Sequence, residues 1–170
     1  MMSRGETAVD ERTFRRLLGR FATGVTVITT GTMERPHGMT ANAFASVSLA
    51  PPLVLVCIDH RRESHRLIQE HGHFAVSVLA ESQRQVSDYF AGRLPAQGMG
   101  SRSLFCPGPG GAPVVVGAIA YLECSLEAVY PGGDHSIFVG RVRHGREGEA
   151  GRPLVFFEGA YRILDNRPAP

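Results

Sequence analysis

Small and hydroxylated side chains crowd one stretch of the sequence, from His37 to Asp59. A glycine turn opens the stretch and the apolar run LVLVCI closes it. Between them stand Thr40, Ala41, Asn42, Ala43, Ser46 and Ser48. Small side chains let a ligand approach the backbone, and hydroxyl and N–H groups can hold an anion without a metal or a lysine. The stretch therefore predicts a cradle for a phosphorylated planar cofactor. The competing interpretation is a turn between two strands, with its hydroxyls bonded to nearby backbone groups.

Three further residues lie at positions that often have a binding or catalytic role. His135 follows the turn PGGD at the start of a strand. It could donate a hydrogen bond to a cofactor or carry a proton, or it is a surface turn residue. Asp59 ends a buried strand whose backbone could hold the polar edge of a heterocycle, unless it merely terminates the strand. Ser64 is placed at a helix N-terminus, where free N–H groups attract anions, although a plain N-cap is the commoner use.

The sequence offers no reaction machinery of its own. It contains no GxSxG, HExxH, Walker or GxGxxG motif. The three cysteines are odd in number and lack a CxxC pair, which argues against a disulfide framework and against a zinc site. Any demanding chemistry would therefore come from a bound cofactor.

The composition indicates one globular domain over residues 1–170, with tails at 1–9 and 165–170. Hydrophobic residues make up 43% and charged residues 20% of the 170 residues. The net charge is +2 and the arginines are scattered, so nucleic-acid binding is not indicated. The N-terminus is polar and no apolar stretch approaches membrane-spanning length. We therefore expect a cytoplasmic protein without a membrane partner.

Short strands joined by tight turns dominate the pattern. Strands are expected at 25–30, 39–48, 53–58, 74–79, 113–130, 135–145 and 154–164. The segment 113–130 is one long strand or a bent pair, and the last strand carries a glycine bulge. Helices are expected at 10–24, from Ser64 to Gly72, and after Ser82, with Asp10, Ser64 and Ser82 as caps. In the first helix Phe14, Leu17, Leu18 and Phe21 recur at helical spacing, and in the third Val86, Tyr89 and Phe90 are expected on the inner face. Residues 92–112 are expected to form one long loop. Because few helices separate the strands, the fold class is mainly β, an antiparallel barrel with peripheral helices.

Six segments, in order, resemble the short-chain flavin reductase family. They are FRRLLGRFATGVTVITT, GMTANAFASVSLAPPLVLVCID, FAVSVLAESQ, GAIAYLECSLEAVYPGGDH, FVGRV and RPLVFFEGAYRIL. The resemblance implies a Greek-key-like, FMN-binding split β-barrel. It particularly points to reductase components of two-component flavin-dependent monooxygenases, such as that of 4-hydroxyphenylacetate 3-monooxygenase. This sequence departs from relatives at His65, where threonine is frequent, and in the loop before Phe105, which lacks the family's acidic-lysine lead-in.

The resemblance also implies ligands, site residues and partners. The cofactor would be FMN or FAD, with NADH or NADPH as co-substrate and no metal. Flavin contacts would fall on Thr40, Ala41, Asn42, Ala43, Ser46, Ser48, Cys57, Ile58, Asp59 and Ser64. The nicotinamide would approach a catalytic His135 and the segment Phe156, Phe157, Glu158 and Gly159, with Tyr161 nearby.

The implied activity is hydride transfer from nicotinamide to flavin, with reduced flavin passed to a separate monooxygenase. The resemblance further implies a homodimer with sites at the subunit boundary. Two alternatives stay open. One is a non-catalytic FMN-binding sensor or carrier. The other is an enzyme like pyridoxamine-phosphate oxidase on the related barrel, for which we see no basic cluster made for the substrate's phosphate.

Overall fold

The computed structural model describes residues 9–94 and 101–165, so most of both predicted tails and part of the predicted long loop lie outside the described residues. The strands are β1 (Thr23–Gly24), β2 (Thr26–Gly31), β3 (Pro36–Ala41), β4 (Phe44–Leu49), β5 (Pro52–Asp59), β6 (His73–Val78), β7 (Phe105–Pro107), β8 (Pro113–Val115), β9 (Ala120–Gly132), β10 (His135–Glu147), β11 (Val155–Phe157) and β12 (Ala160–Arg162). The helices are α1 (Glu11–Leu18), α2 (Glu63–His71) and α3 (Arg84–Phe90), with 3₁₀ turns η1 (Glu81–Gln83) and η2 (Ser101–Leu104).

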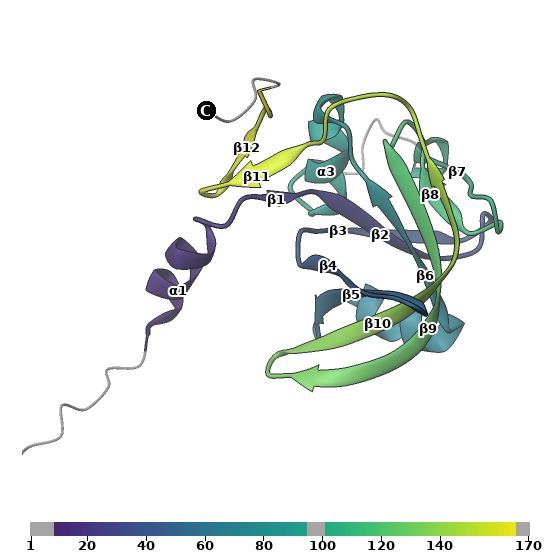
Figure 1. Cartoon of the computed structure of the whole chain (residues 1–170), viewed down its shortest axis with the longest axis horizontal. Helices are drawn as coiled ribbons and strands as arrows, with labels where there is room; N and C mark the ends of the chain where they lie inside the picture. Colours follow the sequence, from purple (N-terminus) through teal and green to yellow (C-terminus); the bar gives the residue numbers. More distant parts are fainter. Residues whose placement is uncertain (1–8, 95–100, 166–170) are drawn as a thin grey trace, which may run out of the picture.

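One antiparallel sheet of the described chain forms the body of the molecule, in the order β3-β2-β6-β9-β10-β5-β4 (Figure 1). Its two edge strands, β3 and β4, are joined in sequence by only Asn42 and Ala43, yet they do not pair with each other. The sheet therefore curls into a barrel that stays open along one line. This confirms the mainly β, split-barrel class expected from the sequence.

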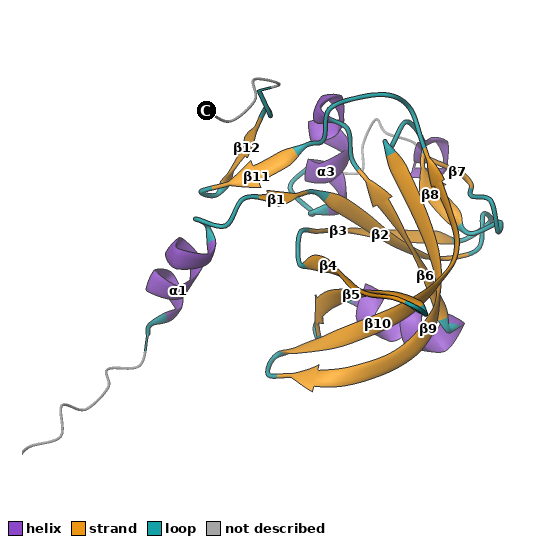
Figure 2. Cartoon of the chain, in the orientation of Figure 1, coloured by secondary structure: helices purple, strands orange, loops and turns teal. Residues whose placement is uncertain are grey.

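Strand alternation explains why the barrel closes around an apolar interior. Along β5, Val54, Val56 and Ile58 are buried while the residues between them are partly exposed. Phe74 and Phe138 are fully buried in the same cluster, and each large apolar side chain buried contributes about 1.5–3 kcal/mol. The helices lie outside the sheet (Figure 2). Ile68 of α2 packs into this cluster, so the helix covers the barrel on that side.

The first helix is shorter than predicted and packs differently. Asp10 is its N-cap, as expected, and accepts a 2.8 Å hydrogen bond from the Thr13 N–H. The helix ends at Leu18 instead of continuing to 24, because the chain must extend to pair β1 with β11. The apolar residues that recur at helical spacing are not buried by their own chain. Phe14, Leu17, Leu18 and Phe21 are 53, 55, 56 and 75% exposed. In Figure 1, α1 stands away from the barrel.

Three other local predictions are corrected by the structure. The strand expected at 39–48 is two strands, because the chain crosses the open line of the barrel at Asn42 and Ala43. The predicted bulge near the C-terminus is a hairpin between β11 and β12, since Glu158 and Gly159 both adopt positive φ values that favour a tight reversal. The expected loop at 92–112 includes η2 and β7, which pairs with β8.

The predicted caps Ser64 and Ser82 are also wrong. Arg62 is the N-cap of α2, and Ser64 lies inside the first turn. Gln83 precedes α3, and Ser82 lies within η1. The connection before α2 is shorter than expected, so this helix starts two residues earlier than predicted. The connection before α3 is longer, so that helix starts one residue later. No helix of the described residues is both long and apolar enough to span a bilayer.

Candidate functional site

A cleft of about 420 Å³ lies along the open line of the barrel. It is lined by Met39, Thr40, Ala41, Asn42, Ala43, Cys57, Asp59, Arg62, Phe90, Ala91, Arg93 and His135. The structure thus brings together three of the predicted segments: the link between β3 and β4, the end of β5 and the start of β10. The register of the ladder explains the meeting, because His135 pairs with Asp59 across β10 and β5.

The hydroxyl of Thr40 bonds to a backbone group of the protein, which agrees in part with the interpretation of this stretch as a turn with satisfied hydroxyls. It donates to the Ser87 carbonyl oxygen at 2.7 Å, which joins the end of β3 to α3. Its oxygen can still accept a hydrogen bond from a ligand. Asn42 and Ala43 are exposed beside it, and the Ala43 carbonyl accepts the Cys57 N–H at 3.0 Å. The small side chains therefore leave this wall of the cleft low and close to backbone.

His135 closes the cleft on the β10 side. Its Nδ1 lies 2.7 Å from Asp134 Oδ1. A carboxylate can only accept, so we assign the ring proton to Nδ1 and leave Nε2 as an acceptor in the neutral ring. That hydrogen bond from His135 also holds the pKa of Asp134 below its usual value.

Asp59 is paired within its own turn. The Arg61 guanidinium contacts the Asp59 carboxylate at 2.6 Å, and the Arg61 backbone N–H donates to it at 2.8 Å. These bonds hold the pKa of Asp59 far below its usual value. Asp59 and Asp134 are therefore carboxylates at neutral pH, and neither can serve there as a proton donor.

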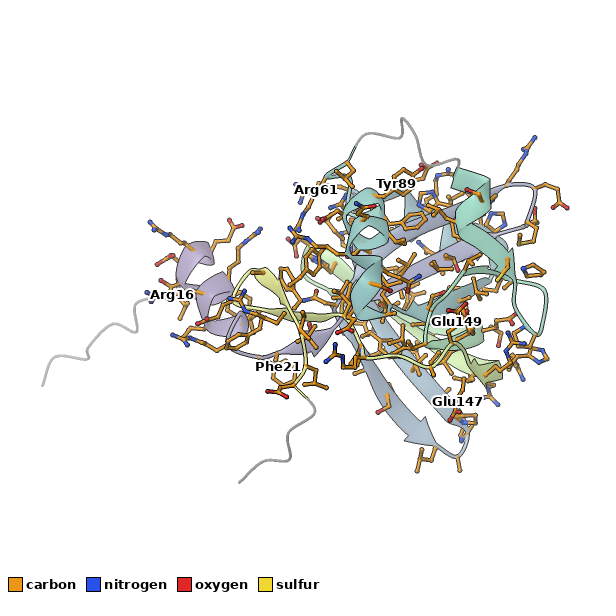
Figure 3. All side chains as sticks on the ribbon, turned by 90° about the horizontal axis from the view of Figure 1, so that it is seen from above. Arg16, Phe21, Arg61, Tyr89, Glu147 and Glu149 are labelled. Atoms are coloured by element: carbon orange, nitrogen blue, oxygen red, sulfur yellow. The ribbon has the colours of Figure 1, made fainter. Side chains whose placement is uncertain are left out.

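A second hollow, of about 480 Å³, adjoins the cleft because Met39, Arg62 and Phe90 line both. Figure 3 shows two of its other lining residues, Arg61 and Tyr89, on the same side of the molecule. The cleft and the second hollow together are called the groove, and Arg62 lies where they meet.

Ser64 faces the second hollow from the first turn of α2. It is 2% exposed, and its Oγ lies 2.8 Å from Nε2 of His37 on β3. Burial lowers the pKa of His37, so its ring is neutral near pH 7. Because Arg62 makes no side-chain capping bond, the first N–H groups of α2 have no side-chain cap and suit an anion.

A third hollow, of about 160 Å³, lies between the link residues and the C-terminal hairpin. Phe156 and Tyr161 line it, together with Thr40 and Asn42. The Tyr161 hydroxyl lies 2.8 Å from Ser87 Oγ and donates to Asp88 Oδ1 at 3.0 Å. Burial raises the pKa of Tyr161, so it remains a neutral phenol that ties β12 to α3.

Some predicted residues lie outside these hollows. Ser46 and Ser48 sit further along β4 and line none of the three. Ile58 is fully buried in the core, so only its backbone is available to a ligand. Phe157, Glu158 and Gly159 also line none of them. Their turn faces the segment after α1, where Glu158 pairs with Arg20 at 2.7 Å.

Sequence reasoning missed several residues that line the cleft and the third hollow, four of which have polar or aromatic side chains. These four are Arg62, Ser87, Phe90 and Arg93. Arg62 belongs to an Arg-Arg pair that composition alone treated as scattered charge. The pattern around Phe90 indicated a helix face but not the groove beside it. Within the described residues no group of three or more His, Cys, Asp or Glu could hold a metal ion, and Cys57, Cys106 and Cys124 are free thiols.

The fold and the groove define a class of protein. The barrel is antiparallel and split, and its cleft has backbone and small side chains on one wall, His135 on the β10 side, and Arg62 just before the start of α2. Neither carboxylate of the cleft can supply a proton, so the groove fits a bound group that brings its own chemistry. This is the architecture of a flavin-binding split barrel.

Comparison with known proteins agrees. The model of the family described as "Flavin reductase like domain" matches residues 18–165. The reductase component of 4-hydroxyphenylacetate 3-monooxygenase from Thermus thermophilus is 44% identical over 151 residues, covering 89% of this chain and 95% of the relative. The monooxygenase reductase subunit HsaB of Rhodococcus jostii is 42% identical over 166 residues, covering 96% and 84%.

A solved structure shares the fold. The NADH:FAD oxidoreductase SgcE6 of Streptomyces globisporus, in complex with NAD and FAD fragments, is 38% identical. It superposes with a TM-score of 0.82 and the match covers 92% of this chain and 94% of that one. The chain belongs to the family of flavin reductase like domains, which confirms the family predicted from the sequence.

Proposed function

We propose that this chain transfers a hydride from NADH or NADPH to FMN or FAD bound in the groove at the open line of the barrel. The observation that carries the proposal is the meeting of the low wall Thr40–Ala43 with His135 across one cleft. When bound together, the nicotinamide gives a hydride and the flavin takes it up with one proton, yielding oxidised nicotinamide and reduced flavin. Relatives named as NADH-dependent flavin and FAD reductases support this reaction.

The chain's part in this reaction is to bind and align. Ala41, Asn42 and Ala43 let a flat ring lie against backbone, and Thr40 Oγ1 can accept one hydrogen bond from it. The second hollow would take the phosphate end of the flavin, at Ser64 and the uncapped start of α2, with Arg62 nearby.

His135 would face the nicotinamide. Its Nε2, left as an acceptor by the bond to Asp134, suits the N–H of a carboxamide group. Held in this way, the nicotinamide would stack over the flavin ring at near-contact distance. The chain would therefore speed the reaction by orientation and by excluding water, without a proton-donating carboxyl of its own.

We further propose a homodimer in which α1 of each chain packs against the other chain. An eight-residue helix is marginal in water alone, and α1 buries none of its residues against its own chain. Two further apolar side chains near the C-terminus, Ile163 and Leu164, are also 71 and 49% exposed. Phe21 projects between α1 and the body in Figure 3. A second copy of the chain would cover these exposed apolar side chains.

The reduced flavin would leave for a separate flavin-dependent monooxygenase, as the names of the relatives suggest. We place the protein in the cytoplasm, where nicotinamide nucleotides are reduced and thiols such as its three cysteines stay free. The 1–170 chain would work as a single domain. None of the observations favours the non-catalytic carrier.

The test is a turnover assay. Purified protein is mixed with NADH or NADPH, with and without FMN or FAD, and nicotinamide absorbance is followed. The proposal expects oxidation that depends on flavin. Tight flavin binding with no oxidation of either nucleotide would overturn it in favour of the carrier.

A further inference from the structure

Two consecutive residues hold the first turn of α2 from opposite sides. Ser64 contacts β3 through the 2.8 Å bond to His37 Nε2. His65 contacts β10 through a 2.9 Å bond between its Nε2 and Ser136 Oγ. Ser136 is 7% exposed, so this second bond lies in the interior between helix and sheet. The start of α2 is therefore fixed to two strands that are far apart in the sheet order.

The direction of the second bond follows from its neighbours. Gln69 Nε2 lies 3.0 Å from the His65 carbonyl oxygen, so the nitrogen of that amide must face it. The same nitrogen lies 3.2 Å from His65 Nδ1, which is therefore assigned as an acceptor. The ring proton is then on Nε2, and His65 donates to Ser136 Oγ.

The Ser136 hydroxyl also reaches a second imidazole. His60 Nε2 lies 3.1 Å from Ser136 Oγ, and the hydroxyl proton is free to go there. His60 belongs to the turn between β5 and α2, and its backbone N–H donates to the Asp134 carbonyl at 3.1 Å. The ring of His65 packs edge-on against His60 and Phe138, with centroids 5.0 and 5.1 Å apart. One hydroxyl thus joins α2, the turn before it and β10.

The place of Ser136 in its strand gives this junction a consequence. Side chains alternate along a strand, so Ser136 points to the helix side while its neighbour His135 lines the cleft. We propose that Ser136 is a positioning residue that sets the separation between the phosphate end of the groove, at Ser64, and the nicotinamide end, at His135. The assignment rests on the proposed function, but the clamp itself is a property of the unliganded chain.

The test compares Ser136→Ala with Ser136→Thr, which keeps the hydroxyl. Ser125→Ala is the matched control, since Ser125 on β9 also accepts one side-chain bond, from Arg143 Nε at 2.8 Å, outside the groove. Three quantities are measured: amide hydrogen exchange of residues 62–66 without ligand, flavin affinity by fluorescence quenching, and kcat and KM for NADH.

For Ser136→Ala we expect faster exchange in the first turn of α2, together with a roughly tenfold weaker flavin affinity and a roughly tenfold higher KM, because losing a part-buried hydrogen bond carries a penalty of that order. The value of kcat should change less than KM. Ser136→Thr should restore all three quantities, and Ser125→Ala should change none.

If Ser136→Ala does not fold, His65→Ala against His65→Gln on the helix repeats the comparison. A Ser136→Ala protein indistinguishable from Ser125→Ala in exchange and affinity would overturn the positioning role. Absence of nicotinamide oxidation by the wild-type chain would instead count against the proposed function. The hydrogen-exchange and flavin-affinity measurements would still test the positioning role of Ser136.

Discussion

His135 Nδ1 lies 2.7 Å from Asp134 Oδ1, at the mouth of the cleft opposite Asp59. The bond fixes which ring nitrogen carries the proton and turns the histidine into an acceptor toward the groove. His135→Ala should therefore lower kcat/KM for NADH by about 10- to 100-fold, in the range of a lost orienting contact in an active site. Flavin affinity should stay within about twofold, since no flavin contact is removed.

Steady-state kinetics and flavin fluorescence measure the two quantities separately. Asp134→Asn is the graded control, because it keeps the shape of the partner and removes its charge, and we expect a smaller loss. Equal losses of flavin affinity and of NADH efficiency in His135→Ala would contradict a nicotinamide-side role.

The low wall of the cleft predicts a steric block at Ala43. Ala43→Leu adds bulk where a flat ring is proposed to lie against backbone, so flavin affinity should fall by at least about tenfold. The melting temperature should change little, because Ala43 is exposed. Ala45→Leu places the same side chain two residues further along β4, also exposed and outside the hollows, and should bind flavin normally. Equal affinities in the two variants would remove Ala43 from the site.

Stability should decline as pH falls below about 6.5, the pKa of an ordinary histidine. Burial lowers the pKa of His37 and of His65, so the folded chain resists protonating rings that the unfolded chain protonates readily. The free energy of unfolding is therefore highest above that pH and is lost as the pH drops through the folded-state values. Urea unfolding at several pH values between about 7.5 and 5 measures it. The decline should shrink in the double variant His37→Gln and His65→Gln, and an unchanged slope would assign the effect to other groups.

The exposed stripe of α1 predicts the state of association. Leu17→Glu places a charge in the middle of the stripe and should convert a dimer to a monomer in sedimentation experiments, because an apolar contact would then have to bury an unpaired carboxylate. Arg16→Glu reverses a charge on the neighbouring residue, outside the apolar stripe, and should leave the dimer intact. A wild-type chain that is monomeric at high concentration would rule out α1 as an exchanged arm.

Much of the fold could be predicted because β-branched runs and turn residues record it locally. The strands around Val27, Val56 and Phe138, and the turn before His135, follow from alternation and from Pro-Gly-Gly-Asp. The helix ends were less predictable. Ser64 has the right side chain for a cap, but its hydroxyl is used by His37, a partner 27 residues away that no local pattern reveals.

Sequence reasoning identified the part of the candidate site that lies in one continuous segment. It missed the residues that only the fold brings to the site. Thr40 to Ala43 are contiguous, and family resemblance placed His135 opposite them. Arg62 and Arg93 line the cleft, and Ser87 the third hollow, only because α2 and α3 flank the open edge of the barrel. The exposure of Phe14 and Leu17 has a related cause, because periodicity identifies an apolar face but not whether the fold of the chain covers it.

The most direct measurement is an anaerobic rapid-mixing experiment on the flavin-loaded protein. NADH is added, and the visible absorbance of the flavin is followed together with nicotinamide absorbance, using NADH and NADH deuterated at C4. We expect both signals to fall together, one flavin reduced for each nucleotide oxidised, with slower decay for the deuterated form. Flavin that stays oxidised in the presence of bound NADH would rule out hydride transfer in the groove.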